Sequence, residues 1–483
     1  MGTAPKPAGG PRPADPSHGE GIRPGRLAIV AACAVVLAFV PPPSGITPEA
    51  WRLFAIFIAA IAMVVVHAAD LFTASLLALA AAVLTGTVTP KEMYAGFSED
   101  FILLIVVAFL VSRSVIQSGL GARMALHLIK RLGGSTLGVA YSMAIVDLVI
   151  APAFPSNTAR SGVLYPITTA LCGGFGADPR TGNRVRLGAF LNLSAMTGIS
   201  LSSALWLTAM AANPAGAQIA GDFGVTITFG SWLLAASLPT LVCAALMPLL
   251  LERLVRPEIT RTPEAPRLAA ESLESMGPMK ASEWITGAVF LSMVVLWALP
   301  APLHVDRVAV ALGGLGILVV SGIYRVADLR KEGQALEIWM WFSVLYTLSS
   351  LLNARGFMAY LGAHLARGLQ GLPPYLAYVA VVLAYVLLHY LFVSQSAHLL
   401  ALFGVFLAVA KQAGAPVGLT AYMLLFATNF FSCITPQGSS ANVLFAGSGF
   451  LSSSDIYKVG GAATALNTAV FLTVGTAWIL LVT

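Results

Sequence analysis

The stretch APAFPSNTARSGVLYPI, residues 151–167, decides the fold because it places polar residues between two strongly apolar segments. Its centre holds Ser156, Asn157 and Thr158, followed by Arg160. Ser, Asn and Thr are preferred at helix N-caps. The pattern therefore predicts a hairpin of two half-helices, with a polar tip where the second half-helix begins.

The composition around this stretch is that of a membrane protein. Of 483 residues, 58% are hydrophobic and 10% are charged, whereas soluble domains carry about 25% charged residues. The apolar runs are continuous, many reach the length that crosses a bilayer, and only helices or closed barrels satisfy the backbone in lipid. We expect an all-α polytopic membrane protein with about 11 transmembrane helices, at 27–42, 51–67, 70–88, 101–118, 187–222, 230–251, 284–300, 307–324, 338–354, 416–446 and 461–482.

The charge distribution sets the expected orientation. The net charge is +6, but Lys and Arg cluster in short connections, which is typical of cytoplasmic loops and does not suggest nucleic-acid binding. Residues 1–26 are rich in Pro, Gly and Ala, and we expect a disordered cytoplasmic tail followed by a retained signal-anchor. The C-terminus would then be periplasmic or extracellular. The four cysteines show no disulfide or metal-ligand spacing, so no metal site is predicted.

An internal repeat relates the two halves of the chain. The segment SGLGARMALHLIKRLGG from residue 118 matches RGFMAYLGAHLARGLQG from residue 355, and FPSNTARSGVL matches FVSQSAHLLAL. Five expected crossings separate the copies, and an odd number gives them opposite orientation. This is the inverted repeat of many secondary transporters. The second polar cluster consists of Ser394, Gln395, Ser396 and His398, which match Ser156, Asn157, Thr158 and Arg160 in turn.

Two of the expected spans contain polar interruptions. The span 187–222 carries Asn213 and Pro214, and the span 416–446 carries Ser439, Ser440 and Asn442. These segments are too polar for lipid contact but suit unwound backbone that lines a cavity.

The two tips favour an anion with a charge at each end. Free N–H groups and the positive end of the helix dipole attract anions at helix N-termini, so two opposed tips suit a dicarboxylate. Arg160 remains charged, and a charge at the bilayer centre costs about 2.5–3.5 kcal/mol. A bound dianion or the nearby Asp147 could compensate it. His398 is either a site residue that can titrate or a packing histidine.

At this point the sequence resembles the divalent anion/sodium symporter (DASS) family over about residues 45–483. The resemblance is carried by SNTAR at 156–160, TAMAANP at 208–214, HYLFVSQSAH at 389–398 and FAGSGF at 445–450. The details are closer to the branch that exchanges dicarboxylates and tricarboxylates. The family implies a homodimer, a scaffold with an elevator-like transport domain, and carboxylate binding at the two tips.

Combined with the repeat, the resemblance gives a domain plan and a candidate site. The segments are a tail (1–26), scaffold helices (27–100), a first repeat (101–251) with hairpin 136–175, a cytoplasmic linker (252–283), scaffold helices (284–335) and a second repeat (336–483) with hairpin 376–410. The expected substrate-binding residues are Ser156, Asn157, Thr158, Arg160, Asn213, Pro214, Ser394, Gln395, Ser396, His398, Ser439, Ser440 and Asn442. No catalytic residue and no cofactor is predicted.

The chain departs from the symporter pattern at the second tip, where Gln395 and Ser396 replace Asn and Thr, and it lacks the Thr-Pro-Pro-Asn loop. Arg160 and His398 could replace the sodium charges, and a fixed cation makes the crossing of an empty carrier costly. We therefore expect sodium-independent exchange of succinate, malate, 2-oxoglutarate, tartrate or citrate across a bacterial inner membrane. A sodium-coupled symporter remains an alternative. An intramembrane hydrolase lacks a Gly-x-Ser-x-Gly motif, and an anion channel lacks a continuous polar path.

Overall fold

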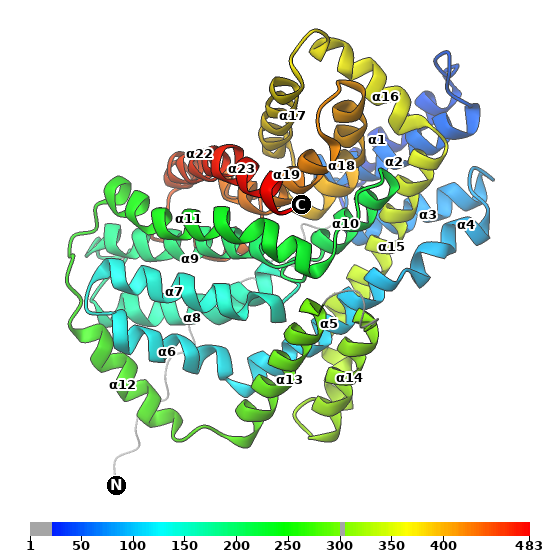
Figure 1. The fold of residues 1–483 in the computed structure, drawn as a ribbon. Helices are drawn as coiled ribbons and strands as arrows, with labels where there is room; N and C mark the ends of the chain where they lie inside the picture. The colour runs from blue at the N-terminus through cyan, green and yellow to red at the C-terminus, as the bar shows by residue number, and fades with distance from the viewer. Residues whose placement is uncertain (1–21, 300–304) are drawn as a thin grey trace.

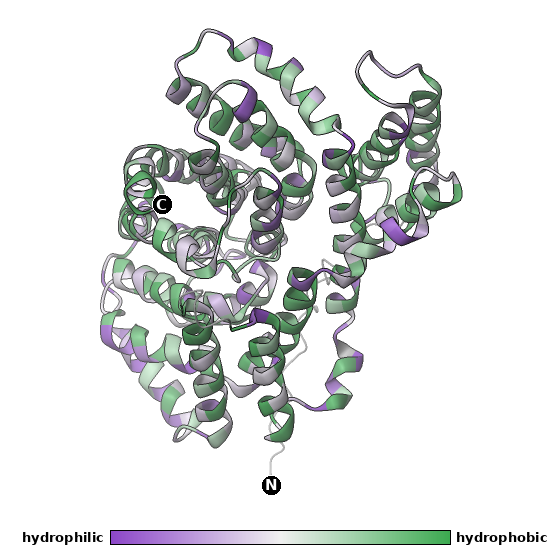
Figure 2. Cartoon of the chain, turned by 45° about the vertical axis from the view of Figure 1, so that its right-hand side comes forward, coloured by the Kyte–Doolittle hydropathy of each residue, from purple (hydrophilic) through white to green (hydrophobic). Residues whose placement is uncertain are grey.

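The protein is described from a computed structural model that covers residues 22–299 and 305–483 (Figure 1). In this part of the chain the regular structure is helical, and ten helices are long and apolar enough to cross a membrane. Hydrophobic residues dominate these helices, with hydrophilic ones gathered in short stretches (Figure 2). The predicted fold class is confirmed. Residues 1–21 of the predicted tail (1–26) lie outside the described residues. The first helix begins at Pro24, which is inside the range expected for the tail.

Two long helices from the two halves of the chain, α5 (Asp100–Ser118) and α15 (Gly333–Ala354), pack against each other. The Phe101 ring lies edge-on to the rings of Phe342 and Tyr346, at centroid distances of 6.3 and 4.8 Å. We call this pair the α5–α15 layer. The helices that pack on it are α2 (Pro48–Val65), α3 (Leu71–Leu84), α4 (Pro90–Ala95), α13 (Ala281–Ala298) and α14 (Arg307–Val320), and α1 (Pro24–Phe39) packs on α2.

Both predicted hairpins are present. The first consists of α7 (Thr136–Ile150) and α8 (Asn157–Gly174), and the second of α17 (Pro374–Leu388) and α18 (Gln395–Gln412). At each tip a serine hydroxyl accepts a hydrogen bond from the N–H three residues later, at 3.3 Å in both cases. The serines have nearly the same backbone angles, φ −145° and ψ 124° in the first and φ −146° and ψ 126° in the second. The N-caps predicted at Ser156 and Ser394 therefore exist.

Both predicted interruptions are also present. The first break (206–211) separates α9 (Val185–Leu205) from α10 (Ala212–Asp222), and the second break (431–439) separates α19 (Val417–Phe430) from α20 (Ser440–Ala446). The first interruption ends just before Asn213 and Pro214, which lie in the first turn of α10. The hairpins and these four helices are together called the tip bundle.

Asn213 and Asn442 play the same structural part in the two breaks. The Asn213 amide donates to the carbonyls of Ser203 and Trp206 at 3.1 and 3.2 Å. The Asn442 amide donates to the carbonyls of residues 432 and 435 at 2.7 and 2.9 Å. All three residues lie 229 positions after their counterparts in the first break. A broken helix leaves carbonyls without partners, and no water is available in lipid to satisfy them. The two asparagines supply the missing donors.

The predicted linker 252–283 contains a helix of its own. Its α12 (Glu264–Met276) packs on α6 (Leu120–Leu132) through the buried residues Ala265 and Ala269. An isolated bridge joins Ser135 to Arg261. The bridge joins the basic connections near residues 133 and 256, and Glu258 accepts hydrogen bonds from the N–H groups of Arg186 and Leu187, which adds the connection near residue 184. The remaining long elements are α11 (Phe229–Val255), α16 (Phe357–Ala366), α22 (Gly461–Val470) and α23 (Thr476–Val482).

Candidate functional site

A polar cavity of about 240 Å³ lies where the tip bundle meets the α5–α15 layer. The first tip (155–158) and the second tip (393–396) both line it, together with residues of the two breaks. Its residues from the tip bundle are Pro155, Ser156, Asn157, Thr158, Met210, Ala211, Val393, Ser394, Gln395, Ser396, Ser439 and Ser440. We call this space the tip cavity.

The two tips are hydrogen-bonded to each other. The Asn157 amide donates to Oε1 of Gln395 at 3.0 Å, although the residues lie 238 positions apart. The Gln395 amide in turn donates to the carbonyls of Thr428 and Asn429 at 2.9 and 3.1 Å. Folding therefore brings the two halves of the repeat together at one point.

The first tip is also joined to the second break. The hydroxyls of Thr158 and Ser440 lie 2.5 Å apart. Both residues line the tip cavity, so this contact closes a ring of hydroxyl and amide groups around it. Such groups both donate and accept hydrogen bonds and can therefore match a carboxylate in several orientations.

The helix N-termini give the cavity its electrostatic character. Helices α8 and α18 each contain 18 residues, and each begins at a tip. The first N–H groups of a helix have no partner within it, and the aligned peptide dipoles place roughly half a positive charge at this end. Two such ends at one cavity are an arrangement that favours a small anion over a cation.

Arg160 is fully buried behind the first tip and does not line the cavity. Its guanidinium donates to Oδ2 of Asp147 at 2.8 Å, to Oδ1 of Asn157 at 2.6 Å, to the Ile199 carbonyl at 3.2 Å and to the hydroxyls of Ser202 and Ser203. The ion pair with Asp147, one of the two interpretations left open by the sequence, is therefore present. Arg160 can reach a ligand in the cavity only through Asn157.

His398, the repeat counterpart of Arg160, has very different surroundings. It is fully buried, and its two ring nitrogens have no hydrogen-bond partner within the described residues. The rings around it belong to Tyr385, His389, Phe392 and Phe431, at centroid distances of 4.4 to 5.3 Å. Tyr385 occupies the position that corresponds to Asp147, 238 residues earlier. The second repeat thus replaces a buried ion pair with an aromatic cluster.

The structure brings eight of the thirteen predicted site residues together around the tip cavity. The other five are Arg160 and His398 behind the tips, Asn213 and Asn442 at the backbone carbonyls, and Pro214 in a different cavity of about 460 Å³. Sequence reasoning missed the wall formed by the α5–α15 layer, which consists of Phe109, Gln334, Glu337, Ile338 and Trp341. The only local signal for this wall was a polar pair, Gln334 and Glu337, just before an expected span.

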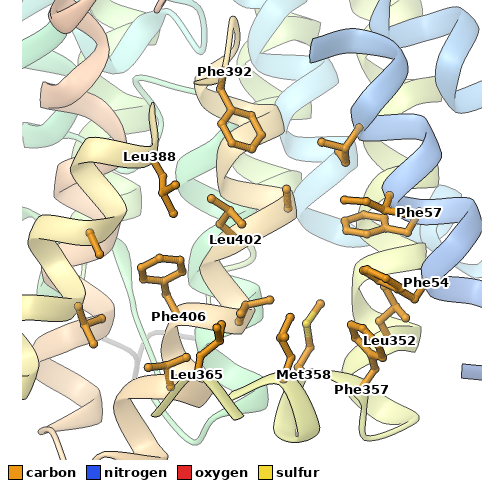
Figure 3. Close-up of a pocket in the computed structure, with 18 of the residues that line it drawn as sticks. Phe54, Phe57, Leu352, Phe357, Met358, Leu365, Leu388, Phe392, Leu402 and Phe406 are labelled. Carbon is orange, nitrogen blue, oxygen red and sulfur yellow. The ribbon is translucent and has the colours of Figure 1, made fainter. Parts of the chain in front are cut away.

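A larger cavity of about 480 Å³ lies elsewhere, among α2, α16, α17 and α18 (Figure 3). The labelled side chains that point into it are apolar, among them Phe54, Phe57, Met358 and Phe406. An anion there would lose its hydration without gaining a partner, so this lining does not suit an anion. No group of three His, Cys, Asp or Glu side chains that could hold a metal ion occurs within residues 22–299 and 305–483.

Comparisons with known proteins identify relatives of this chain and a solved structure of similar fold. A Bacillus subtilis protein named "Putative malate transporter YflS" is 38% identical over 454 residues, which cover 94% of this chain and 95% of that protein. The Spinacia oleracea protein "Dicarboxylate transporter 2, chloroplastic" is 35% identical over 458 residues, covering 94% of this chain and 81% of the relative. The solved structure of Neisseria gonorrhoeae MtrF has a similar fold, with a TM-score of 0.59, 13% identity and coverage of 94% of this chain and 98% of that one.

The family model described as "Sodium:sulfate symporter transmembrane region" matches residues 24–483, which is nearly the whole chain. With an inverted repeat of hairpins and interrupted helices that meet at a polar cavity, the chain belongs to the divalent anion/sodium symporter family of membrane transporters.

Proposed function

We propose that the protein exchanges small di- or tricarboxylates across the membrane. The observation that carries this proposal is the meeting of two N-capped half-helices, from opposite halves of the chain, at one polar cavity. Each helix end can accept one carboxylate. The names of the two relatives, a malate transporter and a dicarboxylate transporter, support the same substrate class.

The surroundings of Arg160 support transport without sodium. Its guanidinium bonds to an amide oxygen, a backbone carbonyl, two hydroxyls and a carboxylate. Oxygen ligands of this kind also suit a hard cation, so Arg160 fills the place that a dissociable cation would need. Because the Arg160–Asp147 pair is neutral as a whole and cannot leave, the carrier needs no dissociable cation at this place, which supports transport without sodium.

The repeat also supports an elevator-like movement of the tip bundle along the α5–α15 layer. The tip cavity lies against Phe109 of α5 and Ile338 of α15. With the repeat offset of 237, their counterparts are Tyr346 and Phe101, whose rings are 4.8 Å apart. This second pair marks the mirror position of the cavity. It lies eight residues away along each helix, which at about 1.5 Å per residue predicts a displacement of about 12 Å.

The distribution of basic residues supports a cytoplasmic opening in the present state. Gln334 and Glu337 follow the basic connection RVADLRKE, which belongs on the cytoplasmic side by the positive-inside rule. We further propose a homodimer in a bacterial inner membrane, with the N-terminus cytoplasmic and the C-terminus on the other side. Native mass spectrometry of the detergent-solubilised protein tests the dimer, and a C-terminal fusion to a reporter active only in the periplasm tests the orientation.

The transport proposal is tested with labelled succinate and proteoliposomes, with or without unlabelled dicarboxylate inside, in sodium-containing and sodium-free buffer. We expect uptake only with internal dicarboxylate and no effect of sodium. Uptake into empty vesicles driven by a sodium gradient would contradict exchange and would support the second candidate, a sodium-coupled symporter. Malate, 2-oxoglutarate, tartrate and citrate follow as competing substrates to define the specificity.

A further inference from the structure

One acidic side chain lies in the wall of the tip cavity. Among the described residues that line the cavity, Glu337 is the one with a formal charge. It is exposed, and none of the ion pairs between described residues involves it. An unpaired carboxylate weakens the binding of any anion beside it. Its presence opposite the tips therefore calls for a role other than holding the substrate.

The inverted repeat places a second carboxylate at the corresponding point of α5. The two copies align at Gly119 and Gly356. Gly119 directly follows α5 and has a φ of 80°, and Gly356 lies two residues after the end of α15 and has a φ of 78°. With this offset of 237, the counterpart of Glu337 is Asp100. The counterparts of Ile338 and Trp341 are residues 101 and 104.

These three counterparts lie together in one cavity. Asp100, Phe101 and Leu104 all line the separate space of about 460 Å³ between α5, α10 and the start of α14. Asp306 and Arg307 also line it, and their formal charges cancel. The wall that faces the tips thus has a copy at the other end of the α5–α15 layer, where it faces α10 and not the tips, and each copy carries one repeat-related carboxylate.

The charges at the tips and on the wall are complementary only when the carrier is empty. Two helix N-termini without a ligand present partial positive charges that a carboxylate attracts. A bound dicarboxylate reverses this, because its own negative charge covers the helix ends and repels the wall. The attraction is therefore present in the empty state and absent in the loaded state.

We propose that Glu337 and Asp100 are alternate electrostatic latches that hold the unloaded tips at the two ends of their travel. The inference rests on the proposed exchange function and deepens it. Glu337 retains the empty tip bundle in the present state, and Asp100 retains it in the opposite state. Substrate binding releases either latch, so the bundle crosses when loaded and stays when empty.

The test measures which state the empty carrier occupies. Thr158→Cys places a thiol at the first tip in a Cys33→Ser background, which removes the exposed native cysteine. Right-side-out proteoliposomes prepared without dicarboxylate are treated with a membrane-impermeant thiol reagent from outside, which is the non-cytoplasmic side of the protein. We expect Glu337→Gln to raise the labelling rate about threefold to tenfold, as for one charge facing two helix ends. Asp100→Asn should lower it by a similar factor.

The matched controls are Glu337→Asp and Asp100→Glu, which keep the charge. They should leave the labelling rate within about twofold of the parent, which is less than the change expected for the loss of one charge. An unchanged labelling rate in both Glu337→Gln and Asp100→Asn would overturn the latch. A change of the labelling rate in the same direction in both variants would also overturn it, because the two latches are expected to act on opposite ends of the movement. Size-exclusion profiles and thermal unfolding verify that each variant folds.

A transport readout separates this inference from the function on which it rests. In proteoliposomes, Glu337→Gln should increase efflux into dicarboxylate-free buffer while exchange with external dicarboxylate continues. If the parent protein itself transports into empty vesicles, the exchange proposal fails. The opposite labelling shifts of the two variants still decide whether the latch exists.

Discussion

The buried pair of Arg160 and Asp147 gives the sharpest prediction. Both side chains are fully buried, and the pair joins the start of α8 to the neighbouring arm of the same hairpin. Removing one partner leaves a buried charge without compensation, which costs about 3–5 kcal/mol. That is a large fraction of the roughly 5–15 kcal/mol by which proteins are stable. We therefore expect Arg160→Met to lower the thermal stability of the solubilised protein strongly.

The double variant separates the structural from the functional part of this pair. Asp147→Asn combined with Arg160→Met leaves no buried charge, so most of the stability should return. Exchange should stay low, because the first tip has lost the cation that bonds to Asn157. The second repeat shows that this place can be filled without an ion pair, since Tyr385 and His398 occupy it there.

Thermal unfolding in detergent and succinate exchange in proteoliposomes are measured on the same preparations. Two results would refute the reasoning. If the double variant is no more stable than Arg160→Met, the uncompensated charge is not what destabilises the single variant. If the double variant exchanges succinate at the parental rate, Arg160 only joins the arms of the hairpin and does not replace a cation.

Three further predictions concern the breaks, the tips and the packing of the layer. Asn213→Ala and Asn442→Ala should each cost about 1–3 kcal/mol per carbonyl left without a donor, so similar losses in thermal stability are expected, and an effect at only one site would contradict their equivalence. Gln395→Ala removes the bond between the tips and should raise the KM for succinate about tenfold, on the order of one lost hydrogen bond to the site, whereas the control Gln412→Ala at the far end of α18 should leave it unchanged. Gly96→Ala would place a methyl group 2.7 Å from the Ser343 carbonyl oxygen and should lower the free energy of unfolding by about 1–3 kcal/mol. A variant as stable as the parent would show that the end of α4 can move away from α15 without cost.

Local signals in the sequence were sufficient for the apolar helices and the hairpins, though not for α12 within the expected linker. Hydropathy marked the spans, because lipid requires long apolar helices whatever surrounds them. Ser156 and Ser394 marked the tips, because an N-cap acts on N–H groups within three residues of itself. The odd number of crossings between the two copies of the repeat then predicted their opposite orientation without any knowledge of their contacts.

The roles of the individual polar residues could not be assigned in the same way. Arg160 and Asn157 are three residues apart and lie on one face of α8, yet one lines the cavity and the other lies behind it. Their difference depends on Asp147 and on the hydroxyls of α9, which only packing brings close. Asn213 and Asn442 looked like ligands in the sequence but satisfy backbone carbonyls of the breaks.

By itself, the sequence determined a helical membrane protein with two hairpins whose tips are N-capped half-helices, because these properties depend on hydropathy and on neighbours within one helical turn. Only the tertiary structure decided which polar groups share a cavity, since the bond between Asn157 and Gln395 spans 238 positions. The tertiary structure also placed Glu337 opposite the tips. Its position follows from the docking of one group of helices on another, and no local pattern of residues encodes that contact.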